Sequence, residues 1–314
     1  MIPSPARYHL IHETSYHYAS PVSLSRQLLH LTPRESRWQR LLRHDILVSP
    51  TPTGERQRED CFGNTVRELT LEYPHDALIV RAESIVEVLP HLPATAQAAL
   101  AQASAGDTGY LDDSPPWEAV RNALAYGAHP ICVEANRYQF ESTYVRVKHQ
   151  FAAYAATSFT PGRPVLAAAQ ALMSRIHNEF AFDPEATTVA TPVSTVLAEK
   201  KGVCQDFAHL MLSCLRSQGL AARYVSGYLL TQPPPGQPRL VGADASHAWV
   251  SVFCPELEGG RWVDFDPTNN LLPDTQHITL AWGRDFADVS PLRGVILGGD
   301  AHQPEVAVTV TPIA

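Results

Sequence analysis

The 314-residue sequence has no run of about 18 apolar residues, the length that a helix needs to cross a membrane. Its first segment, MIPSPARYHLIHETSYHYAS, lacks the apolar core and small-residue cleavage site of a secretory signal peptide. Cysteine is sparse, and no CxxC pair occurs, so neither a disulfide framework nor a zinc ribbon is indicated. The five cysteines are widely spaced: Cys61, Cys132, Cys204, Cys214 and Cys254. We expect a cytoplasmic protein with free thiols.

Charged residues are also scarce, at 18% of the chain, which argues against a highly charged disordered protein. The 24 basic and 32 acidic side chains give a net charge of −8. This balance argues against non-specific binding of nucleic acid and against docking on an anionic membrane, so we expect neither partner. Hydrophobic residues make up 45% of the chain, enough for a sizeable core, and the 26 prolines predict many stiff loops.

The chain divides into three regions with different patterns. Residues 1–90 contain several segments of apolar and polar alternation bounded by Pro, Gly or Asn, which predicts a β-rich N-terminal domain. Residues 91–115 are rich in Ala, Gln, Ser, Gly and Asp and predict a linker, with a short Ala-rich helix as an option. Residues 116–314 begin with helical patterns, of which 163–180 is a good amphipathic helix, and continue with a further helix and three strands. The predicted fold class is therefore α+β.

The segment KKGVCQDFAHLMLSCLRSQG (200–219) is the most informative part of the sequence. Its apolar residues recur at helical spacing, and Cys204 lies in the first turn of the predicted helix. At that position the unpaired N–H groups and the helix dipole stabilise a thiolate, and the same N–H groups can donate to a developing oxyanion. The alternative is that Cys204 is a small buried hydrophobe, as most isolated cysteines are. Cys214, in the middle of the apolar face, fits that alternative.

Local motifs for metal or phosphate chemistry are missing. His209 lies five residues after Cys204, about 140° around the helix, so the two side chains do not share a face and a local Cys/His metal site is not expected. The patterns HExxH, GxGxxG and GxSxG and a P-loop do not occur. We expect no metal and no cofactor, and the chemistry must come from residues that the fold brings together.

A predicted hairpin brings a histidine to an aspartate. SHAWVSVFC (246–254) alternates cleanly, and RWVDFDPTNN (261–270) follows as a second strand after the loop PELEGG. Counting back from this loop, His247 falls opposite a position between 266 and 268, which makes Asp266 its direct or diagonal neighbour. Asp264 falls opposite Val250 or thereabouts and is the second choice, because a bulge can shift the register.

Each of these residues also has an ordinary explanation. His247 can be a histidine that packs at a strand end, and Asp266 can start a turn, as Asp-Pro commonly does. Together with a cysteine at a helix start, however, they fit one arrangement: a nucleophilic thiol, a general base and an orienting carboxylate.

The motifs around these residues resemble a known family. GVCQDFAH, SHAWVSVF and WVDFDPTNN are similar to the three motifs of the transglutaminase-like superfamily. The segments 222–229 (ARYVSGYL), 242–249 (GADASHAW) and 283–295 (GRDFADVSPLRGV) resemble its bacterial branch, and the first 90 residues resemble the β-rich N-terminal domain of such bacterial proteins. The resemblance therefore covers nearly the whole chain.

The resemblance implies a papain-like α+β core with Cys204 as nucleophile, His247 as base and Asp266 as carboxylate. It also implies a thioester formed at a carboxamide or peptide carbonyl, from which the acyl group passes to an amine or to water without a metal. The calcium sites of large animal transglutaminases are not carried over, because the sequence shows no EF-hand-like acidic loop.

Several supporting residues are less certain candidates. No side-chain oxyanion donor can be identified, and Asn178, Thr191 and Gln205 are only options. Asp244 and Trp249 flank His247 and are expected to orient or shield it.

Two further residues, Arg284 and Asp285, lie in the family-like GRD segment, but a structural ion pair explains them equally well.

The leading function is a cysteine-dependent amidase or peptidase that acts on a peptide or amide substrate. Water is the expected acyl acceptor, because cross-linking requires a seat for a bulky amine and protection of the thioester from water. The alternatives are a protein-glutamine amine transferase, a catalytically silent binding or scaffold protein, and a thiol redox protein. The last lacks a resolving cysteine near Cys204 in the sequence. The natural substrate, the oligomeric state and the role of the β domain stay open.

Overall fold

A computed structural model describes residues 4–91, 109–125, 132–230, 246–255, 261–300 and 303–313. The N-terminal region forms a sheet of long antiparallel strands in the order β2-β5-β1-β4-β3. Its strands are β1 (Ala6–Leu29), β2 (Gln39–Ser49), β3 (Gly54–Glu59), β4 (Thr65–Leu71) and β5 (His75–Val88). This part agrees with the β-rich N-terminal domain predicted from apolar and polar alternation.

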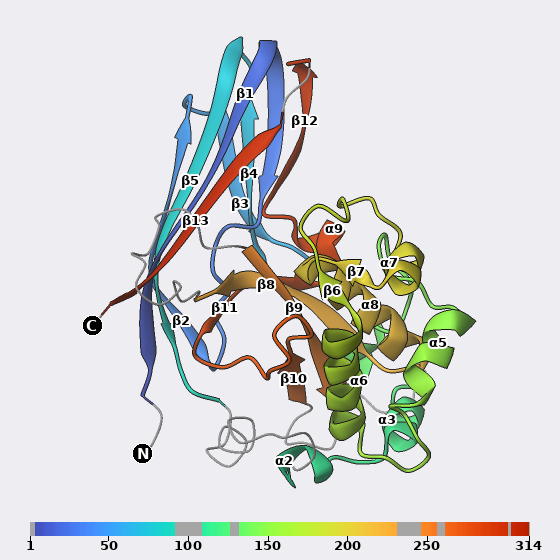
Figure 1. Ribbon diagram of the computed structural model, residues 1–314. Coiled ribbons are helices and arrows are strands. Elements are labelled where there is room, and N and C mark those ends of the chain that lie inside the picture. Colours follow the sequence, from blue (N-terminus) through green and yellow to red (C-terminus); the bar gives the residue numbers. More distant parts are fainter. Residues whose placement is uncertain are drawn as a thin grey trace, which may run out of the picture.

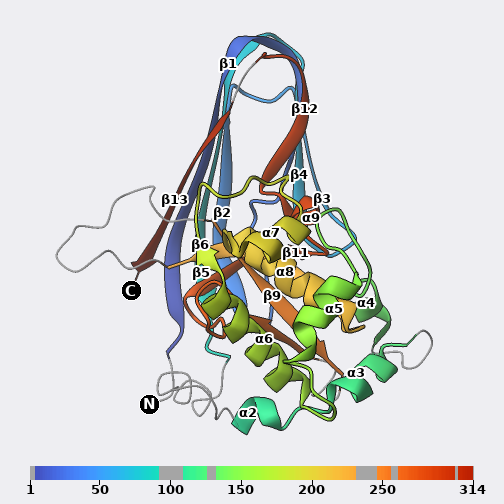
Figure 2. The ribbon, with the colours of Figure 1, turned by 45° about the vertical axis from the view of Figure 1, so that its right-hand side comes forward.

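Strand β1 organises this sheet because it is 24 residues long and serves two sets of neighbours. Its first half pairs with β5, the register breaks between His17 and Val22, and its second half pairs with β4. Buried and less buried side chains alternate along the first half, as expected for a strand that covers a core with one face. Figure 2 shows β1 bending over at the far end of the sheet.

Two strands from the end of the chain complete the N-terminal sheet. β12 (Leu292–Gly298) pairs with the second half of β1, and β13 (Pro304–Ile313) pairs with the first half. Figure 1 shows both strands lying against the blue strand β1. The expected division, in which all of 116–314 forms one core, therefore differs from the sheet membership of residues 292–313. The reason is physical: a strand's local pattern does not reveal which distant edge it will pair with.

The core contains a second antiparallel sheet, in the order β10-β9-β8-β11. Its strands are β8 (Ala222–Leu229), β9 (Ser246–Cys254), β10 (Arg261–Phe265) and β11 (His277–Gly283). Two short strands that precede this sheet in the sequence, β6 (Ala181–Phe182) and β7 (Lys201–Gly202), form a parallel pair of their own.

Two helices, α6 and α8, are long, and the other described helices are short. The described helices are α2 (Gly109–Asp112), α3 (Trp117–Ala123), α4 (Val133–Asn136), α5 (His149–Ala156), α6 (Val165–Glu179), α7 (Val193–Glu199), α8 (Cys204–Ser217) and α9 (Phe286–Val289). The amphipathic helix predicted at 163–180 is confirmed as α6. Of the expected linker 91–115, residues 92–108 lie outside the described residues.

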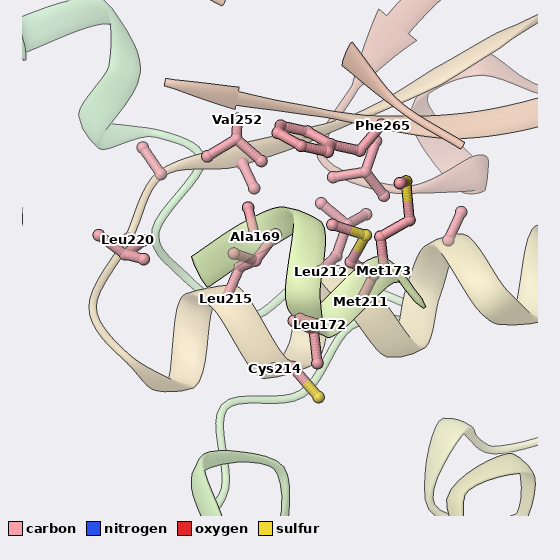
Figure 3. Packing of buried hydrophobic residues seen from close by; sticks show 14 of the residues in the cluster. Ala169, Leu172, Met173, Met211, Leu212, Cys214, Leu215, Leu220, Val252 and Phe265 are labelled. Atoms are coloured by element: carbon pink, nitrogen blue, oxygen red, sulfur yellow. The ribbon is translucent and has the colours of Figure 1, made fainter. Parts of the chain in front are cut away.

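Helices α6 and α8 cover one face of the four-stranded sheet (Figure 1). In Figure 3, Leu172 of α6 and Leu212 of α8 lie in the same cluster as Val252 and Phe265 of the sheet. All residues of α8 from 206 to 216 are buried, and burying a leucine side chain stabilises a fold by about 1.5–3 kcal/mol. This packing fixes the start of α8, and therefore Cys204, relative to the sheet.

The opposite face of the four-stranded sheet packs against the N-terminal sheet. Tyr228, Ile278 and Leu280 share one hydrophobic cluster with residues of β1 and β5 such as Leu10 and Val80. The four-stranded sheet thus lies between the helices and the N-terminal sheet, and the predicted α+β class is confirmed. Among the described residues, no helix combines the length and the hydropathy that crossing a bilayer requires.

Candidate active site

Helix α8 begins at Cys204 because the preceding residues form a tight entry. Val203 is extended, with φ −114° and ψ 179°, and its N–H donates to Asp206 Oδ2 at 2.9 Å. The hydroxyl of Thr187 donates to the same oxygen at 2.6 Å. Only glycine fits at position 202, since a Cβ there would lie 2.7 Å from this oxygen. The entry places a partly exposed thiol on the first residue of the helix.

The Cys204 thiol lies at the first residue of helix α8. The first N–H groups of an α-helix have no acceptor within the helix, and its N-terminus carries partial positive charge. His247 lies close enough to this thiol for the Cys204 side chain to raise the pKa of the imidazole. The fold therefore brings together Cys204 and His247, the residues expected as nucleophile and base.

His247 links the thiol to a carboxylate. It lies on β9, is 8% exposed, and its Nε2 is 2.7 Å from Asp266 Oδ2, which leaves Nδ1 for Cys204. Burial alone favours the neutral imidazole and lowers its pKa. The hydrogen bonds to Asp266 and Cys204, together with the negative charge on both, outweigh burial and raise the pKa of His247 to about 10. The imidazole is therefore protonated at neutral pH.

Asp266 is fully buried and is held by donors on both carboxylate oxygens. Oδ2 accepts from His247, from Asn269 Nδ2 at 2.8 Å and from His277 Nε2 at 3.1 Å. Oδ1 accepts from the backbone N–H groups of Thr268 and Asn269. Burial tends to raise the pKa of this carboxyl, but the hydrogen bonds and the two imidazoles lower it well below its usual range. The group is a fixed negative charge that holds the histidine in place.

The predicted hairpin supports this pairing. β10 pairs with β9 with Phe265 opposite Val250, so Asp266 lies diagonally across from His247. Asp264 lies opposite Ser251, one position from the expected place, and makes no hydrogen bond with His247 among the described residues. The preference for Asp266 over Asp264 as the partner of His247 agrees with this geometry.

Trp249 forms the wall beside the histidine. Its ring centroid is 6.1 Å from that of His247 and 5.3 Å from that of His277, which it meets edge-on. Its indole N–H donates to Asp264 Oδ2 at 2.9 Å. Asp264 therefore holds Trp249 beside His247, and its expected role in orienting or shielding the histidine stays a prediction.

Sequence reasoning missed His277 and Asn269, which both donate to Asp266. His277 opens β11 and is buried, and burial lowers its pKa although the charge of Asp266 opposes that shift. The segment HITLAWG signals a strand, yet nothing local shows that this strand lies beside β8 and close to Asp266. Asn269 had a signal in the sequence, because an aspartate commonly bonds groups two or three residues later in a turn.

The other expected residues fall elsewhere. Gln205 is partly exposed, and no contact of its amide with the triad is found in the described part of the chain. Asn178 is exposed near the end of α6, and Thr191 Oγ1 accepts from the N–H of Thr188. None of the three is placed as an oxyanion donor. Asp244 lies outside the described residues.

Arg284 and Asp285 have structural partners. Arg284 pairs with Asp288 at 2.9 and 3.0 Å. Asp285 is the N-cap of α9, and its carboxylate accepts from the N–H groups of Ala287 and Tyr144. The two residues do not pair with each other, and the structural explanation accounts for both.

His247, Asp266 and His277 are the group that could hold a metal ion within the described ranges, since their ligand atoms all lie within 4.8 Å of one another. A metal there would have to displace the hydrogen bonds that join both imidazoles to the carboxylate. In this structure both imidazoles are hydrogen-bonded to the Asp266 carboxylate.

Comparison with known proteins identifies the family. Residues 8–87 match the bacterial transglutaminase-like N-terminal region, and residues 152–267 match the transglutaminase-like superfamily. An uncharacterised protein of Mycobacterium tuberculosis is 38% identical over 311 residues, covering 98% of this chain and 93% of that protein. One from Mycobacterium leprae is 30% identical over 311 residues, covering 98% of this chain and 99% of that protein.

Two further similarities extend the comparison. A protein-glutamine gamma-glutamyltransferase of Pseudomonas aeruginosa is 32% identical over 139 residues, which is 40% of this chain and 20% of that enzyme. The crystal structure of a candidate cysteine protease from Cytophaga hutchinsonii shares the fold, with a TM-score of 0.71 at 17% identity, over 100% of this chain and 93% of that one. The chain therefore belongs to the transglutaminase-like superfamily, with the N-terminal region of its bacterial members.

Proposed function

We propose that the protein is a cysteine-dependent amidase or peptidase that works through a thioester on Cys204. The observation that carries this proposal is the 2.7 Å hydrogen bond between His247 and the buried Asp266, beside a cysteine that begins α8 and raises the pKa of His247. A thiolate at a helix N-terminus, a protonated imidazole and a fixed carboxylate supply a nucleophile, an acid and an orienting group.

The reaction follows from the geometry. The Cys204 thiolate attacks the carbonyl carbon, and the N–H groups at the start of α8 stabilise the oxyanion. The intermediate collapses as His247 donates its proton to the leaving amine, which leaves a thioester and a neutral imidazole. Water then attacks the thioester, His247 takes a proton from it, and the thiolate departs from the carboxylic acid product. Asp266 stabilises the imidazolium before and after each turnover.

Hydrolysis is favoured over amine transfer because it asks less of the site. The thiol is partly exposed, so water has an approach to the thioester. The alternative is transfer to an amine, and the sequence similarity to the Pseudomonas aeruginosa gamma-glutamyltransferase supports it. The Cys204 thiol forms no disulfide and the mechanism needs it reduced, so a reducing compartment such as the cytoplasm suits the proposed reaction.

The first test needs no substrate. A short pulse of iodoacetamide across pH 5–8, followed by peptide mapping, should label Cys204 at a lower pH than Cys61, an exposed cysteine that serves as the internal control. Replacing His247 with glutamine should move the labelling of Cys204 to higher pH and leave the pH profile of Cys61 unchanged. Labelling of the two cysteines with the same pH profile would contradict the activated thiol.

The second test separates hydrolysis from transfer. Glutamine-containing peptide amides are incubated with the protein, with and without methylamine, and the free acid and the methylamide are measured by mass spectrometry. We expect free acid to dominate at millimolar amine, and Cys204→Ala to form neither product while it unfolds at the wild-type temperature. Methylamide as the main product would establish the transferase, and turnover by Cys204→Ala would remove the thiol from the mechanism.

A further inference from the structure

A cavity of about 660 Å³ lies where the N-terminal sheet meets the four-stranded sheet. The segment 34–39 and Val88 line it from the N-terminal side, and strands β8 to β11 line it from the core. Four of the five tryptophans of the protein face it: Trp38, Trp249, Trp262 and Trp282. Its described lining includes neither Cys204 nor His247, so it is separate from the thiol.

An arginine is fixed in the wall of this cavity by two tryptophans. Arg223 of β8 is 7% exposed, and its guanidinium carbon lies 3.6 Å from the ring centroid of Trp282 and 4.3 Å from that of Trp262. The guanidinium of Arg34 lies 3.5 Å from the same Trp282 centroid. Two groups this close to one ring centre must occupy opposite faces. The two indole rings therefore fix the guanidinium of Arg223 in place, and a fixed guanidinium is suited to binding a ligand.

Arg223 lacks what the other buried arginine has. Arg216 is 1% exposed and donates to the backbone carbonyls of Phe140, Ala222 and Arg284. Within the described residues Arg223 donates to no acceptor, and its buried Nε has no partner. A buried guanidinium normally has its N–H groups paired, because leaving them unpaired is costly. The unpaired Nε leaves this guanidinium with fewer hydrogen bonds than its burial requires.

Three arginines (Arg34, Arg37 and Arg223) line the cavity with two carboxylates (Glu134 and Asp264), so its arginines outnumber its acidic side chains. Burial lowers the pKa of Arg223 to about 10, with Asp264 opposing the shift, so the side chain is charged at neutral pH. Asp264 accepts from Trp249 and gives Arg223 no hydrogen bond among the described residues. Arg34 Nε and Trp282 Nε1, which line the same cavity, are buried without partners as well.

We propose that this cavity binds a small organic anion, whose carboxylate or phosphate group pairs with Arg223 while its body packs against the tryptophans. The volume exceeds what a bare inorganic anion fills and falls in the usual range for small-molecule sites. The planar fork of a guanidinium matches either anion. The site adjoins the triad, because His277 lines the cavity and hydrogen-bonds Asp266.

Binding is measured on the full chain by tryptophan fluorescence and thermal unfolding. The probes are phenylacetate and phenyl phosphate, with phenylacetamide as the uncharged match of the first, and acetate and inorganic phosphate as anions without a body. We expect saturable changes with at least one of the two aromatic anions, and at least tenfold weaker binding of the amide and of the bare anions. The stronger of the two aromatic probes identifies the anionic group. Equal responses to acid and amide, or none to either aromatic anion, would overturn the proposal.

Variants assign the binding to Arg223. Arg223→Met keeps an unbranched stem between the indoles and should weaken the best probe at least tenfold, without lowering the unfolding temperature of the free protein. Arg58→Met, which removes an equal charge from β3 outside the cavity lining, should bind like wild type. If Arg223→Met fails to fold, Arg223→Lys keeps the charge, loses the fork and should still bind more weakly. Wild-type affinity in a folded Arg223 variant would refute the assignment.

Discussion

Asp264 lies on β10 and Asp266 follows directly after that strand, yet the two carboxylates have different partners. In Asp266→Asn an uncharged amide replaces the carboxylate to which two imidazoles donate. His247 then loses the negative charge beside it and the acceptor that fixes its tautomer. Asp264→Asn keeps a carbonyl that accepts from Trp249. We expect kcat/KM to fall about 10³–10⁴-fold in Asp266→Asn, as for the corresponding change in serine proteases, and less than tenfold in Asp264→Asn.

The iodoacetamide assay checks the same pair without a substrate. The labelling of Cys204 at pH 6 should slow markedly in Asp266→Asn and stay close to wild type in Asp264→Asn. If both variants lose activity equally, Trp249 and its hydrogen bond to Asp264 matter as much as the triad carboxylate.

How far the site could be predicted depends on how local each contact is. Cys204 was predictable because one helix pattern sets its position, and the His247–Asp266 pair because a single hairpin fixes the register between them. His277 was not, since β11 reaches Asp266 only through the tertiary arrangement of the sheet. The unpaired Arg223 was not predictable either, because the partners of a buried side chain are known only once the fold is.

At the level of elements, the same limit explains the end of the chain. The alternation in residues 1–90 predicts strands correctly, but β12 and β13 carry no mark that sends them to β1. They pair there because each half of the 24-residue strand β1 presents backbone N–H and C=O groups that need hydrogen-bond partners. Arg7 lies opposite Ile313 in the register of β1 with β13, so segments from near both ends of the sequence lie in one sheet.

Strand β8 meets the active site at a glycine. Gly227 pairs with His247 on β9 and with Thr279 on β11, and the Trp249 ring lies over it. A Cβ at this position would lie 2.5 Å from the ring and 2.1 Å from the carbonyl oxygen of Ile278. Gly227→Ala should therefore lower the free energy of unfolding by about 1–3 kcal/mol and slow the labelling of Cys204.

Gly54→Ala is the matched control, because Gly54 also lies in a strand and its added Cβ would meet only an ordinary contact, 3.8 Å from Thr70. Urea unfolding of both variants gives the comparison, and Gly54→Ala should change the midpoint little. Equal midpoints for Gly227→Ala and wild type would show that Trp249 has room to move away from the histidine.

At the scale of the whole molecule, one sheet carries both sites. Strand β9 and the residue that follows β10 place His247 and Asp266 near the start of α8, and strands β8 and β11 bring Arg223 and His277 to the seam with the N-terminal sheet. The N-terminal region therefore does more than cover the sheet, since residues 34–39 close the cavity that lies beside the triad.

The charge state of the triad should set the pH dependence of the enzyme as a whole. The proposed mechanism starts from the Cys204 thiolate and protonated His247, and a pKa of about 10 keeps His247 protonated through the neutral range. Since the proton of His247 goes to the leaving amine, kcat/KM should stay level on the alkaline side and fall only as the pH rises through about 10. The substrate for this measurement is whichever peptide amide turns over in the partition assay.

Asp266→Asn isolates the cause of that alkaline limit. The carboxylate raises the pKa of His247 through its hydrogen bond and its charge, and burial lowers it, so removing the charge must move the alkaline limb to lower pH. We expect a displacement of at least about one pH unit in the residual kcat/KM, and the same displacement in the titration of the His247 ring followed by NMR. Asp264→Asn should leave both curves in place. An alkaline limb that stays put in Asp266→Asn while the NMR titration moves would mean that a group other than His247 limits the reaction at high pH.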